Sequence, residues 1–154
     1  RVTCATIGRI VDLGQKDANN MGSAMAPAAA DTIKMHLSDT NRPSDYYDLI
    51  VTGDLGKVGS ALVKQLFVKY GIVPEPNYSD CGVLMFNDTQ DVHAGGSGCG
   101  CSAAMLCGPL LKKMMQGKIE RLLLVATGAL MSPTTSFQGE SIPGIAHAVA
   151  LENL

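Results

Sequence analysis

A run of glycines beside a histidine and two cysteines is the stretch of this sequence best suited to ligand chemistry. It carries five residues that we predict to bind a ligand, namely His93, Gly95, Gly96, Cys99 and Cys101. Glycine lets the backbone approach a ligand closely and adopt positive φ. The residues from Ser102 onward predict a helix, and the free N–H groups at a helix start attract anions. The stretch therefore predicts a site for an anionic ligand.

Each of these residues also has a structural explanation, which the sequence leaves open. The glycines would equally allow the loop to pack closely against another element, and free cysteines pack as small apolar side chains. His93 fits as a hydrogen-bonded structural histidine. Asp54, which follows a predicted strand, either belongs to the ligand site or caps the next helix.

The cysteines do not have the spacing of a disulfide framework or of a metal site. Five are present, at Cys4, Cys81, Cys99, Cys101 and Cys107. Cys99 and Cys101 form a C-x-C pair, whereas metal and redox pairs are typically C-x-x-C. We therefore expect a reduced, intracellular protein with no resident metal and no other cofactor.

Composition and charge limit the classes of partner. The chain has 154 residues, 46% of them hydrophobic and 17% charged, and a net charge of −2, which indicates one globular domain without a nucleic-acid partner. The longest apolar run, 122–131, is about half of the roughly 20 residues that a membrane span needs. The chain starts at Arg1 with neither an initiator methionine nor a signal peptide, so we expect a fragment of a longer protein.

The predicted elements alternate between strands and helices. Strands are expected at 2–12, 46–52, 81–86, 121–127 and 145–152, with loops at 71–80 and 128–143. Helices are expected from Pro27, after Gly53–Gly59, and at 102–115, the last being apolar nearly all round and so buried. The order βαβαβαββ predicts an α/β fold with a mixed, mostly parallel five-stranded sheet, a buried central helix and an antiparallel last pair of strands.

The turn Gly53–Gly59 lies between a strand and a helix, as dinucleotide-binding turns do. Its spacing is G-x-x-G-x-x-G, whereas the dinucleotide fingerprint is G-x-G-x-x-G. No acidic residue ends a following strand at the distance the fingerprint requires. We therefore do not expect a nucleotide cofactor at this turn.

Several motifs resemble the thiolase-like superfamily. The segments HAGGSGCGCSA and PGIAHAVALE resemble the C-terminal half of thiolases and ketoacyl synthases. The segments GRIVDLGQKDANNMGSAMAPAAADTI, DLIVTGDLGKVG and LLLVATGALMSPTTSFQGESIPGIAHAVALE are similar to a sporulation family of that superfamily, the stage V sporulation AD proteins. The resemblance covers the whole chain and implies a C-terminal thiolase-like domain at residues 1–154, with the N-terminal half of the fold absent from this chain.

The resemblance implies a loss of catalytic residues. In the enzymes of the superfamily the nucleophilic cysteine belongs to the N-terminal half. Where ketoacyl synthases carry a histidine after the second strand, this chain has Gly53–Asp54, and where thiolases carry a proton-shuttling cysteine it has Gln138–Ser141. His93 lies near the position of a thiolase histidine. We therefore expect no catalytic residue here and no condensation chemistry.

The same resemblance implies a ligand and partners. The ligand is dipicolinate (pyridine-2,6-dicarboxylate), taken into the developing spore as its calcium chelate, so that calcium enters only as part of the ligand. The implied partners are the N-terminal half of the same protein, a second copy in a homodimer and other spore membrane transport proteins, at the periphery of the spore inner membrane. Two alternatives stay open: an acyltransferase with His93 as base, and a structural subunit of a membrane-attached complex.

Overall fold

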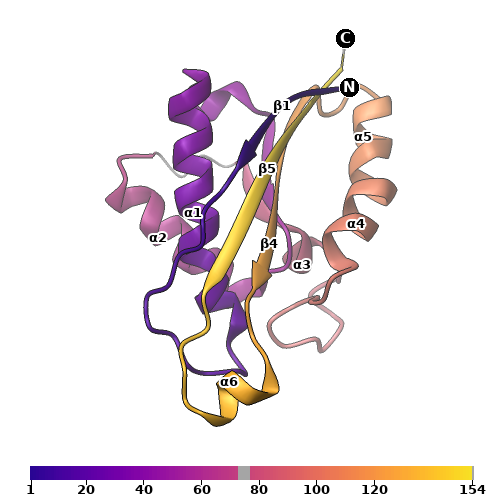
Figure 1. Ribbon diagram of the computed structural model, residues 1–154. Helices are drawn as coiled ribbons and strands as arrows, with labels where there is room; N and C mark the ends of the chain where they lie inside the picture. The colour runs from indigo at the N-terminus through magenta and orange to yellow at the C-terminus, as the bar shows by residue number, and fades with distance from the viewer. Residues whose placement is uncertain (73–76, 154) are drawn as a thin grey trace.

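A five-stranded sheet forms the centre of the computed structural model, which describes residues 1–72 and 77–153 (Figure 1). Its strands are β1 (Val2–Ile7), β2 (Leu49–Thr52), β3 (Tyr78–Asp80), β4 (Arg121–Ala129) and β5 (Gly144–Glu152). They lie side by side in the order β1-β5-β4-β2-β3. β2 runs parallel to β3 and β4, whereas β5 runs antiparallel to β4 and β1. The α/β class and the antiparallel last pair are confirmed, but the sheet is evenly mixed rather than mostly parallel.

The two faces of the sheet are both apolar, as expected for strands covered by helices on either side. Along β4, Leu123 and Val125 face one cluster of buried side chains, whereas Leu122 belongs to the other. In β2, Ile50 and Val51 divide in the same way. This alternation follows from the two-residue repeat of a strand. Figure 1 shows α1 and α2 on one side of the sheet and α4 and α5 on the other.

α1 (Met21–Thr40) and α2 (Gly56–Lys69) cover the first face. Asn20 caps α1, because its side chain accepts a hydrogen bond from the Ser23 N–H at 3.3 Å. The prediction that this helix begins at Pro27 is wrong, since Pro27 lies within α1. The described part of the chain has no helix long and apolar enough to cross a lipid bilayer.

A continuous helical segment covers the other face, formed by α4 (Cys101–Met105), a π-helical turn (Leu106–Leu110) and α5 (Leu111–Met115). It buries four side chains against the sheet, those of Cys101, Met105, Leu110 and Met114. The opposite side is exposed and carries Ala103, Ala104, Cys107, Gly108 and Pro109. The prediction of a helix buried all round is therefore wrong for this side, because small apolar residues can face solvent at little cost.

Five further predictions differ from the structure. β1 ends at Ile7 instead of residue 12, and β2 is preceded by a 3-10 turn at Ser44–Tyr46. The predicted strand at 81–86 is instead the single helical turn α3 (Cys81–Leu84). The predicted loop at 71–80 includes residues 73–76, which lie outside the described residues, and it ends in β3. The predicted loop at 128–143 contains α6 (Pro133–Phe137), which Ser132 and Thr135 start with a reciprocal capping box.

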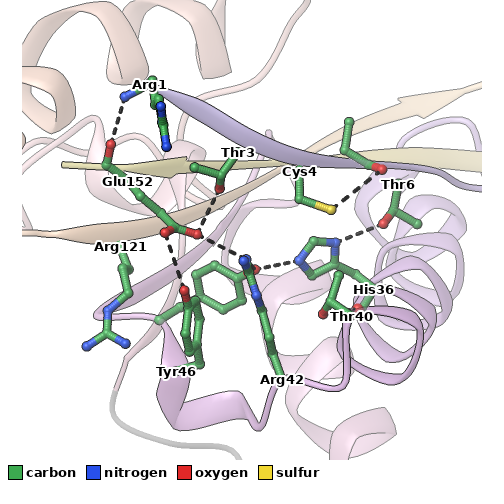
Figure 2. Close-up of polar contacts among 12 residues, drawn as sticks. Arg1, Thr3, Cys4, Thr6, His36, Thr40, Arg42, Tyr46, Arg121 and Glu152 are labelled. Carbon is green, nitrogen blue, oxygen red and sulfur yellow. Dashed lines mark hydrogen bonds and ion pairs between the residues drawn. The ribbon is translucent and has the colours of Figure 1, made fainter. Parts of the chain in front are cut away.

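A polar network joins α1, β1 and β5 at the end of the sheet where β2 and β4 begin (Figure 2). The fully buried His36 ring lies 2.8 Å from Thr6 Oγ1 through Nδ1 and 2.6 Å from the Tyr47 hydroxyl through Nε2. Arg42 donates to the same hydroxyl at 2.9 Å and pairs with the Glu152 carboxylate at 3.1 Å. Burial lowers the pKa of His36, and the Arg42 charge adds to this effect.

We expect this network to lose stability in mild acid. The pKa of His36 is near 6.5 in the unfolded chain and lower in the folded chain, so the unfolded state binds more protons as the pH falls below about 6.5. The free energy of unfolding should therefore decrease, by at most about 1.4 kcal/mol per pH unit, between pH 7 and the folded-state pKa. Urea unfolding of the wild type at a series of pH values measures the slope.

The matched variants are His36→Gln and His147→Gln. His147 is exposed, and its Nδ1 accepts a single hydrogen bond from the Gly8 N–H at 3.1 Å. His36→Gln should flatten the slope, and His147→Gln should keep it. Equal slopes in the wild type and His36→Gln would contradict the assignment.

Candidate functional site

The carboxyl ends of the parallel strands β2 and β4 bring two polar side chains together. Asp54 follows β2 by two residues, and Thr127 lies near the end of β4. Thr127 Oγ1 donates to Asp54 Oδ1 at 3.0 Å and accepts from the Asp54 N–H at 3.2 Å. The crevice outside the carboxyl ends of parallel strands is the usual ligand site of open α/β sheets.

Asp54 also holds the glycine loop against this edge of the sheet. Its Oδ2 accepts from the Gly98 N–H at 3.0 Å and from the Ser97 hydroxyl at 3.5 Å. Gly95 adopts a φ of +110°, and a Cβ on it would lie 2.6 Å from the Gly82 carbonyl oxygen. Only glycine fits there, which explains one of the glycines that mark this loop in the sequence.

Asp80, at the end of β3, holds the starts of α2 and α3, and both of these helix starts contact the glycine loop. Its fully buried carboxylate accepts from the N–H groups that start α2 and α3, at Leu55 (3.0 Å), Gly56 (2.9 Å), Gly82 (3.0 Å) and Val83 (3.3 Å), and from Thr52 Oγ1 (2.7 Å). Burial raises the pKa of Asp80, and these hydrogen bonds oppose the rise. Asp80, and not Asp54, is therefore the side chain that caps α2, which removes the helix-cap explanation of Asp54.

Two adjoining cavities open around Asp54. The first has a volume of about 350 Å³ and lies between the start of α1, the start of α2 and residues 94–97. The second has a volume of about 280 Å³ and is lined by 97–99, Ser102 and 127–129. Four residues line both cavities, namely Met21, Met25, Asp54 and Ser97. The two cavities thus form one cleft with Asp54 in its middle.

The cleft presents several N–H donors around this single carboxylate. The N–H groups of Met21 and Gly22 begin α1, ahead of its first internal hydrogen bond, and α1 has no acidic residue in its first turn. Within the described residues, the N–H groups of Ser97 and Cys99 have no hydrogen-bond partner. A 20-residue helix carries partial positive charge at its start, which favours anionic groups beside Met21 and Gly22.

The structure brings four of the six predicted ligand residues to this cleft. Asp54, Gly95, Gly96 and Cys99 line it. His93 does not line it, because its side chain is 89% exposed and pairs with the equally exposed Asp91 at 3.3 Å. Cys101 does not line it either, because its side chain is buried in the core under α4.

The part of the cleft that α1 supplies was not predicted from the sequence. Asn19, Asn20, Met21 and Gly22 line the first cavity, and Met25 lines both. The usable signal was the pair of asparagines ahead of an apolar run, since asparagine is a preferred helix N-cap. Thr127 was also missed, because it lies within an apolar strand that gives no sign of a polar partner across the sheet.

The buried cysteines next to the cleft are held as neutral thiols. Burial raises the pKa of Cys81 to about 12, and the charges of nearby acidic groups add to the rise. Burial also raises the pKa of Cys101, with Asp54 and Asp80 contributing. A nucleophilic cysteine needs a lowered pKa instead, because the thiolate is the reactive form.

Over residues 1–72 and 77–153, no three or more His, Cys, Asp or Glu side chains are grouped to hold a metal ion.

Comparison with known proteins identifies the family. The family model described as "Stage V sporulation protein AD (SpoVAD)" matches residues 1–152. A curated relative from Bacillus subtilis (strain 168), named "Stage V sporulation protein AD", is 51% identical over 152 residues, which are 99% of this chain and 45% of the relative. The chain thus spans a little under half the length of that relative. It belongs to the stage V sporulation protein AD family.

Proposed function

We propose that this chain is part of a non-catalytic protein of spore formation that binds dipicolinate, as its calcium chelate, for uptake into the developing spore. The Bacillus subtilis relative is named for stage V of sporulation. The observation that carries the ligand assignment is the cleft around Asp54, in which N–H donors lie on both sides of one carboxylate.

Dipicolinate has two carboxylates on one rigid ring, and the cleft offers donors for each. In our proposal one carboxylate accepts from the N–H groups of Met21 and Gly22 at the start of α1. The other accepts from the N–H groups of Ser97 and Cys99 in the glycine loop. Hydrogen bonds to a charged acceptor each contribute about 1.5–3 kcal/mol, which gives a small anion useful affinity.

Residues of the cleft also suit the pyridine ring and the calcium ion of the chelate. Met25 lines both cavities, and methionine sulfur makes favourable contacts with aromatic rings. The Asp54 carboxylate would face the calcium ion, a hard cation that prefers oxygen ligands. His93 is left out of the proposed contacts, because its side chain projects into solvent beside Asp91.

The absence of catalysis is part of the same proposal. Two positions where the superfamily enzymes carry catalytic side chains hold Gly53–Asp54 and Gln138–Ser141 in this chain. Asp54 is occupied with holding the glycine loop, and Gln138 lies in an exposed turn after α6. We further propose that the rest of the protein, beyond the 45% of the relative's length matched here, completes the cleft, and that the protein forms a homodimer at the periphery of the spore inner membrane beside other transport proteins.

Calorimetric titration of the full-length protein with calcium dipicolinate tests the assignment. Cys99→Trp should lower the affinity at least about tenfold, because the indole would fill the second cavity, whereas Cys99→Ser keeps its volume and should bind as the wild type does. Asp54→Asn should weaken binding by about 10–100-fold. Asparagine has no negative charge to face the calcium ion or to accept the hydrogen bond from the glycine loop.

His93→Ala serves as the control outside the cleft and should change the affinity by less than about twofold. Acyl-CoA is the control ligand. Saturable dipicolinate binding that Cys99→Trp removes would support the proposal. Acyl-CoA binding with turnover, and no heat from dipicolinate, would instead indicate the acyltransferase alternative.

A further inference from the structure

The outward face of α2 is a basic and apolar surface, and Val58 is its one exposed residue that also lines the proposed ligand cleft. α2 carries three lysines, Lys57, Lys64 and Lys69, and no acidic residue, although the whole chain has a net charge of −2. All three lysines are exposed. Val58 and Val68 on the same helix are 48% and 67% exposed. Exposed valines between lysines are not explained by packing against the sheet.

The lysines flank the apolar residues around the helix axis. At about 100° per residue, the middle of the exposed arc holds the apolar Val68, Ala61 and Val58, together with Gln65. Lys57 and Lys64 lie on one side of them and Lys69 on the other. Helices that lie in the interface of a membrane combine an apolar stripe with lysines in this way.

A groove between α1 and α2 extends the surface. It has a volume of about 370 Å³, and its lining is mostly apolar, consisting of Leu13, Ser23, Pro27, Leu62, Gln65, Leu66 and Lys69. Leu13, in the loop that borders this groove, is 72% exposed. The Lys34 amine lies 4.8 Å from the Tyr70 ring at the end of α2, which adds a fourth cation. The negative charge of Asp31 on α1 is balanced by an ion pair with the Arg9 guanidinium, at an N–O distance of 2.8 Å.

The outward face of α2 alone is small for a protein interface. A 14-residue helix is about 21 Å long and about 10 Å wide, so its outward face offers roughly 200 Å². Stable protein interfaces bury about 800 Å² on each partner. A bilayer needs no shape-matched counterpart, because a few apolar side chains enter the interface while lysines contact phosphates.

We infer that the outward face of α2, together with Leu13 and the α1–α2 groove, docks on an anionic phospholipid bilayer. Val58, Val68 and Leu13 enter the boundary between headgroups and acyl chains, and Lys57, Lys64 and Lys69 contact lipid phosphates. The inference rests on the membrane location proposed above. The groove shares no lining residue with the dipicolinate cleft, and of the inserted side chains only Val58 lines that cleft.

Co-sedimentation of the full-length protein with lipid vesicles tests this docking. The protein should bind vesicles of phosphatidylglycerol and phosphatidylcholine in equal parts, should bind much less to pure phosphatidylcholine, and should bind less in high salt. Each lysine near an anionic surface contributes about fivefold, so Lys64→Gln with Lys69→Gln should lower partitioning by about 25-fold. Leu13→Ser with Val68→Ser should also weaken binding without a change of charge, and neither residue lines the dipicolinate cleft.

The matched control is Lys112→Gln with Lys113→Gln. It removes the same charge from two exposed lysines of α5, on the opposite face of the sheet (Figure 1). It should change partitioning by less than about twofold. Three results would each overturn the inference. They are an equal loss in both lysine double variants, equal binding to both kinds of vesicle, and salt-sensitive binding to polyglutamate without binding to the mixed vesicles.

Discussion

Asp80→Ala should lower the free energy of unfolding by about 4 kcal/mol or more. The carboxylate is fully buried and accepts four backbone hydrogen bonds, besides the one from Thr52. Alanine would leave those N–H groups without an acceptor, and an unsatisfied buried donor costs about 1–3 kcal/mol. The start of α2 and the start of α3 would lose their cap in the same step.

Urea unfolding of the wild type, Asp80→Ala and Asp80→Asn measures this effect and separates its parts. Asparagine keeps the shape but replaces one acceptor oxygen with a donor group, so we expect about half of the alanine effect. Asp88→Ala removes an exposed carboxylate from the following loop and should change stability by less than about 0.5 kcal/mol. A loss below about 1 kcal/mol in Asp80→Ala would refute the role given to Asp80.

Gly59→Ala should destabilise the protein by about 1 kcal/mol net, because α1 and α2 cross where neither helix has a side chain. A Cβ on Gly59 would lie 2.6 Å from the Gly22 carbonyl oxygen and 2.9 Å from its carbon. Both atoms belong to backbone, so the helices would have to separate, and overpacking of this kind costs about 1–3 kcal/mol. Alanine favours a helix over glycine by about 1 kcal/mol, which offsets part of the cost.

The measurement is thermal or urea unfolding beside Gly100→Ala as the control. Gly100 has a φ of −88°, and a Cβ on it would meet open space out to 4 Å, so its substitution should cost less than about 0.5 kcal/mol. Because Gly22 also lines the cleft, Gly59→Ala should weaken dipicolinate binding as well. Equal stability of the two variants would argue against a close crossing at Gly59.

The order of strands and helices could be predicted because it follows from repeats along the chain. The β-branched residues of β1, the alternation in β5 and the glycine-bounded helix α2 are local patterns. The prediction of a strand at 81–86 is wrong, because a few apolar residues fit a strand or a helix equally well. What decides the outcome is Asp80, whose carboxylate accepts from the Gly82 and Val83 N–H groups and starts a helical turn.

The site was predictable where glycine marks it and not where distant segments meet. Gly95 and Gly96 were identified from composition, and Gly95 does adopt the positive φ that glycine permits. The pairing of Asp54 with Thr127 depends on the register of β2 against β4, which no local pattern encodes. His93 was chosen for its side-chain chemistry, but nothing in its sequence context indicates that it points to solvent.

The π-helical turn at Leu106–Leu110 sets the rotational phase of the helical segment. The buried residues of this segment are Cys101, Met105, Leu110 and Met114. They are four residues apart, except for the step of five from Met105 to Leu110. A π turn holds one residue more than an α turn, and that extra residue keeps Leu110 and Met114 aligned with Met105.

If the same residues formed an unbroken α-helix, its second half would be turned by about 100°. Pro109 and Lys113 would then face the sheet in place of Leu110 and Met114, which would bury a charge. Removing one residue from the turn would instead restore four-residue spacing and keep the same side chains inside. The turn therefore holds one residue more than an α-helix would hold there, and the side chains that face the sheet are the same as in an unbroken helix one residue shorter.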